Sequence, residues 1–399
     1  MKNQFCSALI VVYCLLTACS TGTISPTTPP AQPGQSAQTA PPVEQPTRKA
    51  MHVPAQWSAL PGWTHDDLKP AWETFLQSCT ALKKQVLWSE VCNSAASLQN
   101  PGSAALRTFF ETQFTPYQVV NMDRSEEGMI TGYYEPLLKG SHKPSKRYRF
   151  PIYAAPDELL TIDLSSSYPD LKELKLRGRL DGRKVVPYYT RAEIMSNPQI
   201  LQGYEFLWVE DEVELFFLHV QGSGRIMLDD GEIIKIGYAD QNGHPYSSIG
   251  KLLVQRGELL LENASMQGIK QWGQNNPRKL PELLQNNARY VFFRELPSDL
   301  SGPIGALGVP LTAGRSIAID PQSIPQGAPV YLATTWPNSK KPLNRLMVAQ
   351  DVGSAIKGGV RADFFWGFGH DAGNQAGKMK QSGKMWILMP RAYVPATQP

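Results

Sequence analysis

The most informative stretch of the sequence is Leu346-Met-Val-Ala-Gln-Asp351-Val-Gly-Ser-Ala-Ile-Lys-Gly-Gly359-Val-Arg-Ala-Asp363-Phe-Phe-Trp-Gly-Phe-Gly369. An apolar run leads into Asp351 and a glycine-rich turn, and Asp363 then precedes three aromatic side chains. A carboxyl group among aromatic side chains is costly to ionise, because burial disfavours its charged form. An aspartic acid that stays protonated near neutral pH can act as a general acid. Aromatic faces beside such an acid suit a sugar, so the stretch predicts chemistry on a carbohydrate.

A third acid lies upstream, where Ile317-Ala-Ile-Asp320-Pro-Gln-Ser-Ile-Pro-Gln-Gly327 again places an aspartate between a strand-like run and a turn. Aspartate before a turn commonly bonds backbone amides, and its role is then structural. We interpret Asp320 in this way, as a residue that bonds turn amides near Gly327. Trp366 keeps two interpretations, because its ring can stack on a sugar or fill the core.

The periodicity of apolar residues predicts a mainly β fold with N-terminal helices. Short apolar runs between Gly and Pro turns extend from Leu311 to Leu388 and are typical of a closed barrel or a sandwich. Two alternating runs around Asp230-Gly231 predict a hairpin. Apolar residues recur at helical spacing between Thr64 and Thr112. Two later helices are expected at Ile249–Leu261 and Pro281–Asn287.

The first residues predict export from the cytoplasm. Lys2 and a short apolar segment near Phe5–Thr17 are typical of a bacterial secretory signal, and the segment is too short to span a bilayer. Leu16-Thr17-Ala18-Cys19-Ser20 resembles the lipobox of bacterial lipoproteins, which implies a cleaved signal at 1–19 and lipid on Cys19. Ser20 after that cysteine resembles the sorting signal for the outer membrane. The alternative is an ordinary signal with a chance cysteine.

Residues 20–50 predict a linker, since they hold seven prolines among Ser, Thr, Gln and Ala. Such a segment buries too little apolar surface to offset its ordering entropy, and it acts as an extended tether. Beyond it, Cys79 and Cys92 fall in the expected helical region. They form either a disulfide, which we favour in an exported protein, or two buried thiols.

Charge and ligand types exclude several classes of partner. The net charge is +4, which argues against nucleic acid and is compatible with a weakly anionic polymer such as the cell wall. The histidines, among them His219, His244 and His370, lack metal-ligand spacing. We therefore expect no metal and no cofactor.

Three sequence blocks together resemble one family. They are Thr131-Gly-Tyr133-Tyr134-Glu135-Pro136, then Phe217-Leu-His219-Val-Gln221-Gly-Ser223-Gly-Arg225, and the three-aspartate block from Ala313 to Gly369. In this order, and with the lipoprotein-like start, they resemble the membrane-bound lytic murein transglycosylase A family. The resemblance covers nearly the whole chain after the linker.

The resemblance implies both a fold and an activity. The fold is a double-psi β-barrel with a second, β-rich domain inserted into it and a groove between them. On this chain we expect the barrel at 51–145 and 296–399 and the insert at 146–295. The activity is that of a lyase that cleaves peptidoglycan between N-acetylmuramic acid and N-acetylglucosamine, leaving 1,6-anhydro ends. Its place is the periplasmic face of the outer membrane, by a lipid anchor.

The resemblance also suggests roles for individual residues. Asp363 is expected to act as acid and base, with Asp351 as a partner that shapes the field or orients substrate. Of Tyr133 and Tyr134, which alternate in a strand, at most one should face the groove. The remaining candidates for substrate binding are Glu135, Gln221, Ser223 and Trp366. For Glu135 the alternative is a solvent-facing residue, and for the Gly-Ser-Gly segment it is a tight turn.

Two other functions remain open from the sequence. A non-catalytic lipoprotein could bind peptidoglycan through the same groove, and a hydrolase could use Asp351 and Asp363 as a carboxyl pair. The binder would release no soluble product. The hydrolase would release reducing ends and would need both aspartates. The sequence does not decide between internal and terminal cleavage, and it names no protein partner in wall synthesis.

Overall fold

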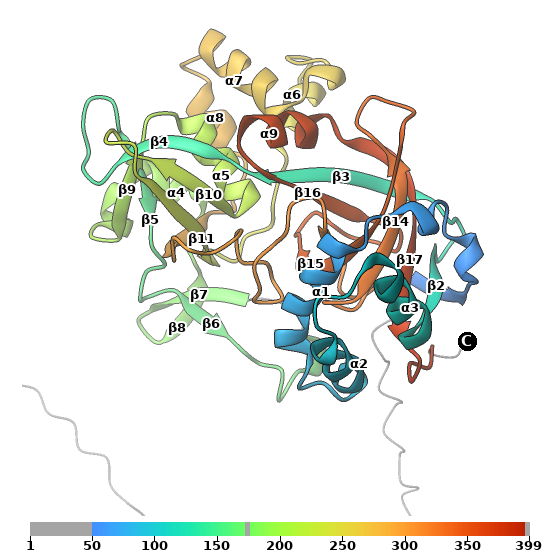
Figure 1. Cartoon of the computed structure of the whole chain (residues 1–399). Coiled ribbons are helices and arrows are strands. Elements are labelled where there is room, and N and C mark those ends of the chain that lie inside the picture. The colour runs from blue at the N-terminus through green and yellow to red at the C-terminus, as the bar shows by residue number, and fades with distance from the viewer. Residues whose placement is uncertain (1–49, 172–175, 396–399) are drawn as a thin grey trace, which may run out of the picture. The chain divides into compact units, whose positions relative to one another are not determined.

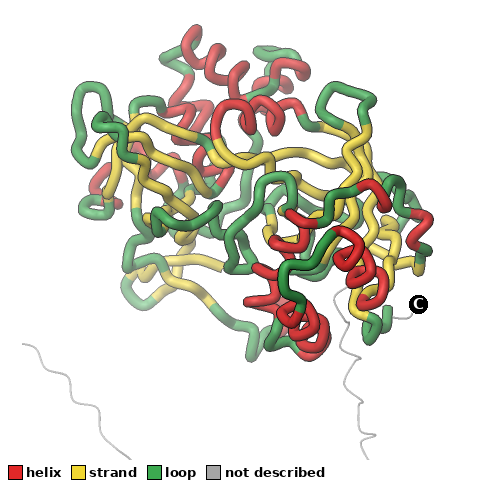
Figure 2. The backbone as a smooth tube through the Cα atoms, in the orientation of Figure 1, coloured by secondary structure: helices red, strands yellow, loops and turns green. Residues whose placement is uncertain are grey.

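The structure is a computed structural model that describes residues 50–171 and 176–395. The predicted signal at 1–19, the lipid site Cys19 and the linker up to residue 49 lie outside the described residues. Within the described ranges, no helix has both the length and the apolar character needed to cross a membrane. Strands dominate, and most helices fall in an early and a middle part of the chain, with one more, α9 (Gly369–Lys378), near the C-terminal end (Figures 1 and 2).

The largest sheet contains eight strands: β1 (Ala50–Pro54), β2 (Phe114–Asn121), β3 (Gly128–Glu135), β13 (Ser316–Ile319), β14 (Pro329–Thr335), β15 (Pro342–Val352), β16 (Ala362–Phe368) and β17 (Lys380–Pro390). Their order is β1-β2-β17-β14-β15-β13-β16-β3, and an added pairing of β17 with β3 closes six of them into a barrel. The prediction of a mainly β fold with a closed barrel is thus confirmed. The double-psi connection of its strands stays a prediction.

Strand β14 shows why these segments form a barrel. Its first four residues are all buried, which requires cover on both faces of the sheet. The apolar core of the barrel covers one face. On the other face Trp63 packs edge-on against Tyr331, with ring centroids 5.6 Å apart, and the Tyr331 hydroxyl donates to the carbonyl of Pro61 over 2.8 Å. The segment before the first helix therefore seals the outside of the barrel wall.

A second sheet of six strands has the order β12-β11-β10-β4-β9-β5. Its strands are β4 (Leu137–Ser141), β5 (Phe150–Tyr153), β9 (Glu205–Val209), β10 (Ser223–Met227), β11 (Ile233–Gln241) and β12 (Val291–Leu296). A small sheet contains β6 (Leu160–Ile162), β7 (Leu176–Asp181) and β8 (Lys184–Pro187). The predicted hairpin is confirmed, since β10 and β11 pair in antiparallel fashion around Gly231.

The change from one sheet to the other occurs at Pro136. Strand β3 belongs to the barrel, and β4 follows it after one residue and pairs with β10 and β9 of the second sheet. The two strands run almost end to end across Figure 1. The sequence placed this division at 145/146, whereas strand residues between 137 and 141 already pair with β10 and β9 of the second sheet. We propose Pro136 as the first junction.

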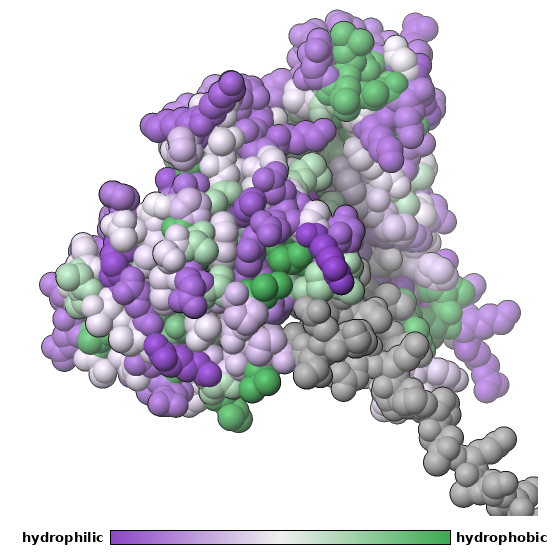
Figure 3. All heavy atoms as spheres, turned by 90° about the vertical axis from the view of Figure 1, so that its right-hand side faces the viewer, coloured by the Kyte–Doolittle hydropathy of each residue, from purple (hydrophilic) through white to green (hydrophobic). Residues whose placement is uncertain are grey.

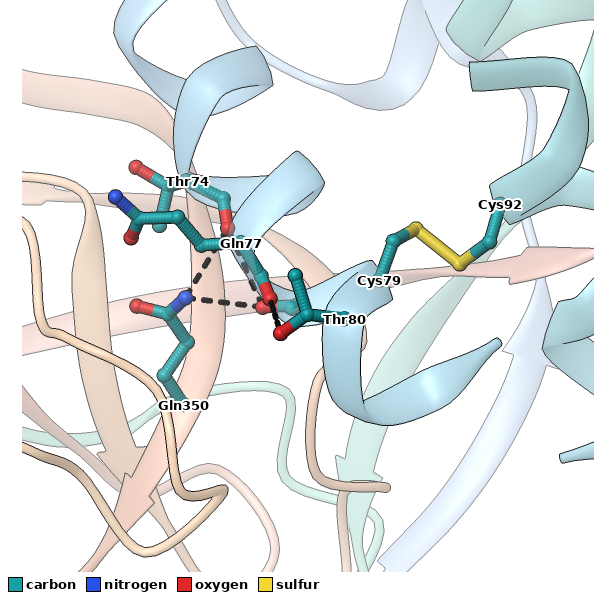
Figure 4. Close-up of a disulfide and its surroundings, with 7 residues drawn as sticks. Thr74, Gln77, Cys79, Thr80, Cys92 and Gln350 are labelled. Carbon is teal, nitrogen blue, oxygen red and sulfur yellow. Dashed lines mark hydrogen bonds between the residues drawn. A yellow bond between two sulfur atoms is a disulfide. The ribbon is translucent and has the colours of Figure 1, made fainter. Parts of the chain in front are cut away.

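Three early helices, α1 (Lys69–Leu82), α2 (Val86–Ser97) and α3 (Ser103–Gln113), confirm the helical region expected from the sequence. Cys79 on α1 and Cys92 on α2 form a disulfide, as favoured from the sequence (Figure 4). Gln350 of β15 donates from its amide to the Thr74 carbonyl over 3.1 Å and to the Ser78 hydroxyl over 2.9 Å. Helix α1 is thereby attached to the strand residue that precedes Asp351.

The other helices are α4 (Arg191–Ser196), α5 (Glu212–Gln221), α6 (Ile249–Gln255), α7 (Met266–Asn275), α8 (Leu280–Gln285) and α9 (Gly369–Lys378). Helices α6 and α8 correspond to the two expected later helices. Helix α9 corrects the expectation of strands throughout the tail. It packs on β3 so closely that a Cβ atom at Gly373 would lie 2.9 Å from the Tyr134 ring. The absence of a side chain at Gly373 therefore permits this close contact.

The view in Figure 3 shows a face that is mostly hydrophilic, with small separate apolar patches. Scattered apolar residues are normal on a protein surface, so these patches need no functional explanation.

Short 3-10 helices complete the described secondary structure, at Trp57–Ala59, Trp63–His65, Pro169–Leu171, Pro198–Leu201 and Leu261–Asn263.

Candidate active site

Asp351 and Asp363 lie on two strands that flank the same residue. Ala318 of β13 pairs with Asp351 of β15 on one side and with Asp363 of β16 on the other. Because neighbouring strands lie about 4.8 Å apart, the two backbone positions are separated by about 10 Å. The barrel therefore brings together the two acids that the sequence placed first. It holds them on adjacent parts of one wall.

One face of β3 contacts these acids in turn. Thr131, Tyr133 and Glu135 are two residues apart, so their side chains point to the same side of the strand. The Thr131 hydroxyl bonds Asp363, the Tyr133 hydroxyl bonds Asp351, and the Glu135 carboxylate bonds Arg225. A single strand thus aligns three charged groups that come from three other strands.

Asp363 has the properties of a general acid. Its side chain is partly buried, and Oδ1 accepts a hydrogen bond of 2.6 Å from the Thr131 hydroxyl. Burial raises the pKa of Asp363 to about 6, and the negative charge of Asp351 adds to this rise. The Thr131 hydrogen bond and the Arg361 charge oppose the rise. Near neutral pH the group can therefore both donate and accept a proton.

Arg361 reaches Asp363 through Thr131. Its Nη2 donates to the Thr131 hydroxyl oxygen over 2.9 Å, which leaves the Thr131 hydrogen for Asp363 Oδ1. Oδ2 of Asp363 has no hydrogen-bond partner among the described residues. The proton of the neutral acid therefore belongs on Oδ2, the oxygen that remains for a substrate.

Asp351 is held from two sides. Oδ2 accepts a hydrogen bond of 3.0 Å from the Tyr133 hydroxyl, and Oδ1 accepts one of 3.0 Å from the Ala306 amide. Burial, with the charges of Asp351 and Asp363, raises the pKa of Tyr133 well above its ordinary value. Tyr133 therefore keeps its proton and remains a donor to Asp351. Of the two tyrosines, Tyr133 is the one that faces the aspartates.

Asp320 has the structural surroundings expected from the sequence. Its residue is 1% exposed, so it lies beneath the surface that carries the other two aspartates. Oδ1 accepts from the Gln322 amide over 3.2 Å, and Oδ2 accepts from the Gly358 amide over 2.9 Å. These bonds attach the loop before β16 to the turn after β13 and thereby help to fix the strand of Asp363.

Tyr134 and Gln221 meet behind β3. Tyr134 points to the side of α9, its hydroxyl lies 3.6 Å from the Met266 sulfur, and burial raises its pKa. Its backbone amide donates to Gln221 Oε1 over 3.2 Å, whereas the Gln221 amide nitrogen donates to no described residue. Ser223 begins β10 after Gly222, whose φ of 78° ends α5. The substrate-binding roles of these residues stay predictions.

Glu135 corrects one interpretation from the sequence. The alternative of a solvent-facing residue is wrong, because the Glu135 side chain is 1% exposed. Its Oε2 accepts from Arg225 Nε over 2.8 Å, and burial raises its pKa. The guanidinium carbon of Arg225 lies 3.8 Å from the centroid of the Phe368 ring. Glu135 therefore positions the Arg225 side chain, which is the more exposed member of the pair.

Trp366 packs against the barrel core. Its ring centroid lies 4.7 Å from that of Phe364 and 5.3 Å from that of Trp336, and its indole N–H donates to the Met379 sulfur over 3.2 Å. The ring remains partly exposed. These contacts fit the core-filling interpretation, and stacking on a sugar stays a prediction.

Sequence reasoning missed Thr131, Arg225 and Arg361 as site residues. Thr131 and Arg225 lie in the sequence blocks quoted above. Arg361 lies two residues before Asp363, immediately before β16, and this spacing is the signal that could have found it. The His219 ring packs in a stacked arrangement with Phe293, with 5.6 Å between the ring centroids, and both of its nitrogens lack a partner in the described structure. No group of three possible metal ligands occurs in the described ranges.

Comparison with known families covers the two sheets. Residues 129–294 match the MltA specific insert domain, and residues 315–389 match the 3D domain. The insert match begins in β3, includes β4, β5, β9, β10 and β11 of the second sheet, and ends within β12. The 3D match includes Asp320, Asp351 and Asp363.

Relatives and solved structures agree with these matches. The membrane-bound lytic murein transglycosylase A of Escherichia coli (strain K12) is 33% identical over 279 residues, which is 68% of each chain. The crystal structure of MltA from Neisseria gonorrhoeae has 41% identity and a TM-score of 0.78, over 88% of this chain and 95% of that one. E. coli MltA with bound chitohexaose has 27% identity and a TM-score of 0.61, over 87% of this chain and 93% of that one. The chain described here belongs to the membrane-bound lytic murein transglycosylase A family.

Proposed function

We propose that the protein is a lytic transglycosylase that cleaves the β-1,4 bond between N-acetylmuramic acid and N-acetylglucosamine in peptidoglycan and leaves a 1,6-anhydro end. The observation that carries the proposal is Asp363, with a pKa of about 6 and one oxygen that has no hydrogen-bond partner among the residues that the structure describes. The family relationship supports the reaction class. The chitohexaose bound to E. coli MltA supports a glycan as substrate.

In the proposed reaction, Asp363 first donates a proton to the leaving sugar and later accepts one from the attacking hydroxyl. Protonated Asp363 donates from Oδ2 to the glycosidic oxygen of N-acetylglucosamine while the bond to the muramyl C1 breaks. The C6 hydroxyl of the same muramyl ring then attacks C1, and its proton passes to the Asp363 carboxylate. No water is consumed. The attack is intramolecular, so the sugar itself supplies a nucleophile already held near C1.

Asp351 would stabilise positive charge at C1 from a distance. A glycosidase that hydrolyses its substrate normally needs a second carboxyl as nucleophile or as base for a water. Both Asp351 oxygens already accept hydrogen bonds, from Tyr133 and from the Ala306 amide. Such bonds weaken the Asp351 oxygens as nucleophiles, because they engage the lone pairs that would attack C1. The arrangement therefore supports the lyase over the two-carboxyl hydrolase.

The test is digestion of purified peptidoglycan by the protein without residues 1–19, with the products weighed by mass spectrometry. We expect muropeptides lighter by one water than hydrolysis products, and no such products from Asp363→Asn. Asp371→Asn is the matched control, because Asp371 is a fully exposed aspartate on α9. Full-mass reducing products would show a hydrolase, and no products from a folded wild-type protein would show a binding lipoprotein.

We also propose that lipid on Cys19 holds the protein at the periplasmic face of the outer membrane. The lipobox-like sequence and the membrane-bound names of the relatives support this location. Cell fractionation after labelling with radioactive palmitate tests it. The wild-type chain should carry label in the outer-membrane fraction, and Cys19→Ser should be unlabelled and soluble. Label in Cys19→Ser would contradict the proposed attachment site.

A further inference from the structure

Arg225 is a charged group near the proposed site that the reaction does not use. It lies on β10 of the second sheet, and its Nε is engaged by Glu135. Apart from that bond, its guanidinium donates to no described residue, and 18% of its side chain is exposed. Arginine has five N–H donors, so its outer nitrogens can still bind a planar acceptor.

Phe368 restricts how a ligand can approach this guanidinium. The ring lies against one face of the group, with 3.8 Å between the guanidinium carbon and the ring centroid, and Phe368 is 38% exposed. An aromatic face holds the guanidinium plane in place without using its N–H groups. The free edge of Arg225 is thereby oriented before any ligand arrives.

The local charge favours an anion. Lys235 pairs with Arg225 across β10 and β11, and its amine donates to the carbonyls of Ser298 and Leu300 over 2.6 Å each. Those acceptors are uncharged, and Glu135 bonds only the Nε of Arg225. The outer nitrogens of Arg225 therefore remain positively charged donors, which attract carboxylates.

The position along β3 sets the distance from the acid. Glu135 follows Thr131 by four residues, and a strand advances about 3.3 Å per residue, so Arg225 is reached about 13 Å beyond Asp363. On β16, Asp363 pairs with Thr131 and Phe368 pairs with Glu135. The distance from Asp363 to Phe368 along β16 therefore matches the distance from Thr131 to Glu135 along β3. This spacing exceeds one sugar ring and reaches the substituents of a neighbouring residue.

We propose that Arg225 and Phe368 form a subsite that binds a carboxylate carried by the glycan strand beside the cleaved bond. The inference rests on the proposed function. Peptidoglycan carries such carboxylates on its peptide stems or, after removal of the stems, on the lactyl groups. A neutral polymer of N-acetylglucosamine has none. The subsite therefore makes the protein prefer acidic wall strands to neutral glycans.

The test compares native peptidoglycan with peptidoglycan whose carboxyl groups have been converted to amides. Charged hydrogen bonds contribute about 1.5–3 kcal/mol, so we expect kcat/KM of the wild type to fall about 10- to 100-fold on the amidated substrate, mainly through KM. Glycan freed of its stems by an amidase forms the third substrate. If the wild type retains its activity on this substrate, the group bound by the subsite is the lactyl carboxylate. If the activity is lost, the group bound is a carboxylate of the peptide stem.

The variant is Arg225→Gln combined with Glu135→Gln, because Arg225→Gln alone would leave a buried carboxylate without its partner. We expect this pair to cleave native and amidated substrates at equal rates. Glu135→Gln alone retains the cation and should keep the wild-type ratio, whatever its absolute rate. Arg147→Gln with Glu210→Gln is the matched control, since Arg147 also bonds a glutamate, over 2.7 Å, and stacks on a ring, that of Tyr148.

The outcomes separate the inference from the proposed function. Equal wild-type rates on native and amidated peptidoglycan overturn the subsite and leave the transglycosylase intact. The same is true if the double variant loses rate by one factor on both substrates, which indicates a structural ion pair. Absence of anhydro products from the wild type on every substrate contradicts the proposed function itself.

Discussion

The Thr131 hydroxyl donates to Asp363 Oδ1 over 2.6 Å and accepts from Arg361 Nη2 over 2.9 Å. The single hydroxyl hydrogen is therefore directed at the acid by the arginine behind it. This bond stabilises the ionised form of Asp363, whereas burial stabilises the neutral form. The pKa of about 6 results from these opposed effects and from the charges of Arg361 and Asp351, so the Thr131 bond and the Asp351 charge can each be removed by one substitution.

The pH dependence of the reaction should follow Asp363. The acid must be protonated in the free enzyme, so kcat/KM should fall as pH rises above about 6. Thr131→Val removes a bond to the charged form and should move this descending limb to higher pH. Asp351→Asn removes a like charge and should move it to lower pH. Initial rates of anhydro product release between pH 4 and 9 measure the two shifts. If the descending part of the pH profile has the same midpoint in the wild type and both variants, Asp363 is not the titrating acid.

Asp363→Asn should stabilise the folded protein at neutral pH. The folded pKa is raised from 3.8 to about 6, so the folded state binds the proton more tightly than the unfolded state. Ionisation of Asp363 therefore costs stability as pH rises from about 4 to 6, and the cost is constant above that window. We expect Asp363→Asn to gain on the order of 1–3 kcal/mol at pH 7.5. Denaturant unfolding should show the gain shrinking toward pH 4; a loss at pH 7.5 contradicts the argument.

Tyr133 and Tyr134 form a matched pair for mutation. Tyr133→Phe removes the 3.0 Å bond to Asp351, whereas Tyr134→Phe removes only a 3.6 Å contact with the Met266 sulfur. Hydrogen bonds to charged groups contribute about 1.5–3 kcal/mol, so Tyr133→Phe should lower kcat/KM about 10- to 100-fold. Tyr134→Phe should stay within a few-fold of the wild type. Equal losses in the two variants would show that Asp351 needs no donor from β3.

The disulfide should stabilise the fold without entering the reaction. Cys79 and Cys92 are 13 residues apart and close a short loop between α1 and α2. Replacing both with serine should cost about 2–4 kcal/mol of unfolding free energy. Activity per folded molecule at 25 °C should remain. A reductant should lower the Tm of the wild type and leave that of the double variant unchanged, and any other pattern contradicts a bridged pair.

Local sequence patterns were sufficient for features built from neighbouring residues. The aromatic flank of Asp363 predicted a raised pKa, the Asp230-Gly231 turn predicted β10 and β11, and Asp320 before a proline turn predicted amide bonds. Each of these depends on interactions within a few positions of the chain or on the strand that the residue occupies. The three blocks of family resemblance then supplied the barrel and its inserted sheet.

Features that depend on distant partners could not be read in this way. Glu135 is buried because Arg225, 90 residues later, neutralises it, and nothing next to Glu135 in the sequence indicates this. Helix α9 buries only the small residues Ala372, Gly373 and Ala376, and Gly373 packs against Tyr134 of β3. The junction at Pro136 required the pairing of β4 with β10. Long-range pairing decided all three.

Strand β3 sets the distance between Asp363 in the barrel and Arg225 in the second sheet, because Thr131 bonds the first and Glu135 bonds the second. Its side chains alternate, so inserting one residue between Thr131 and Glu135 would turn the later contacts to the opposite face. Inserting two residues would preserve every facing and move Arg225 about 7 Å farther from Asp363. Evolution or design can therefore lengthen the spacing only in steps of two. The distance between Asp363 and Arg225 is therefore a discrete quantity, set by pairs of residues along one strand.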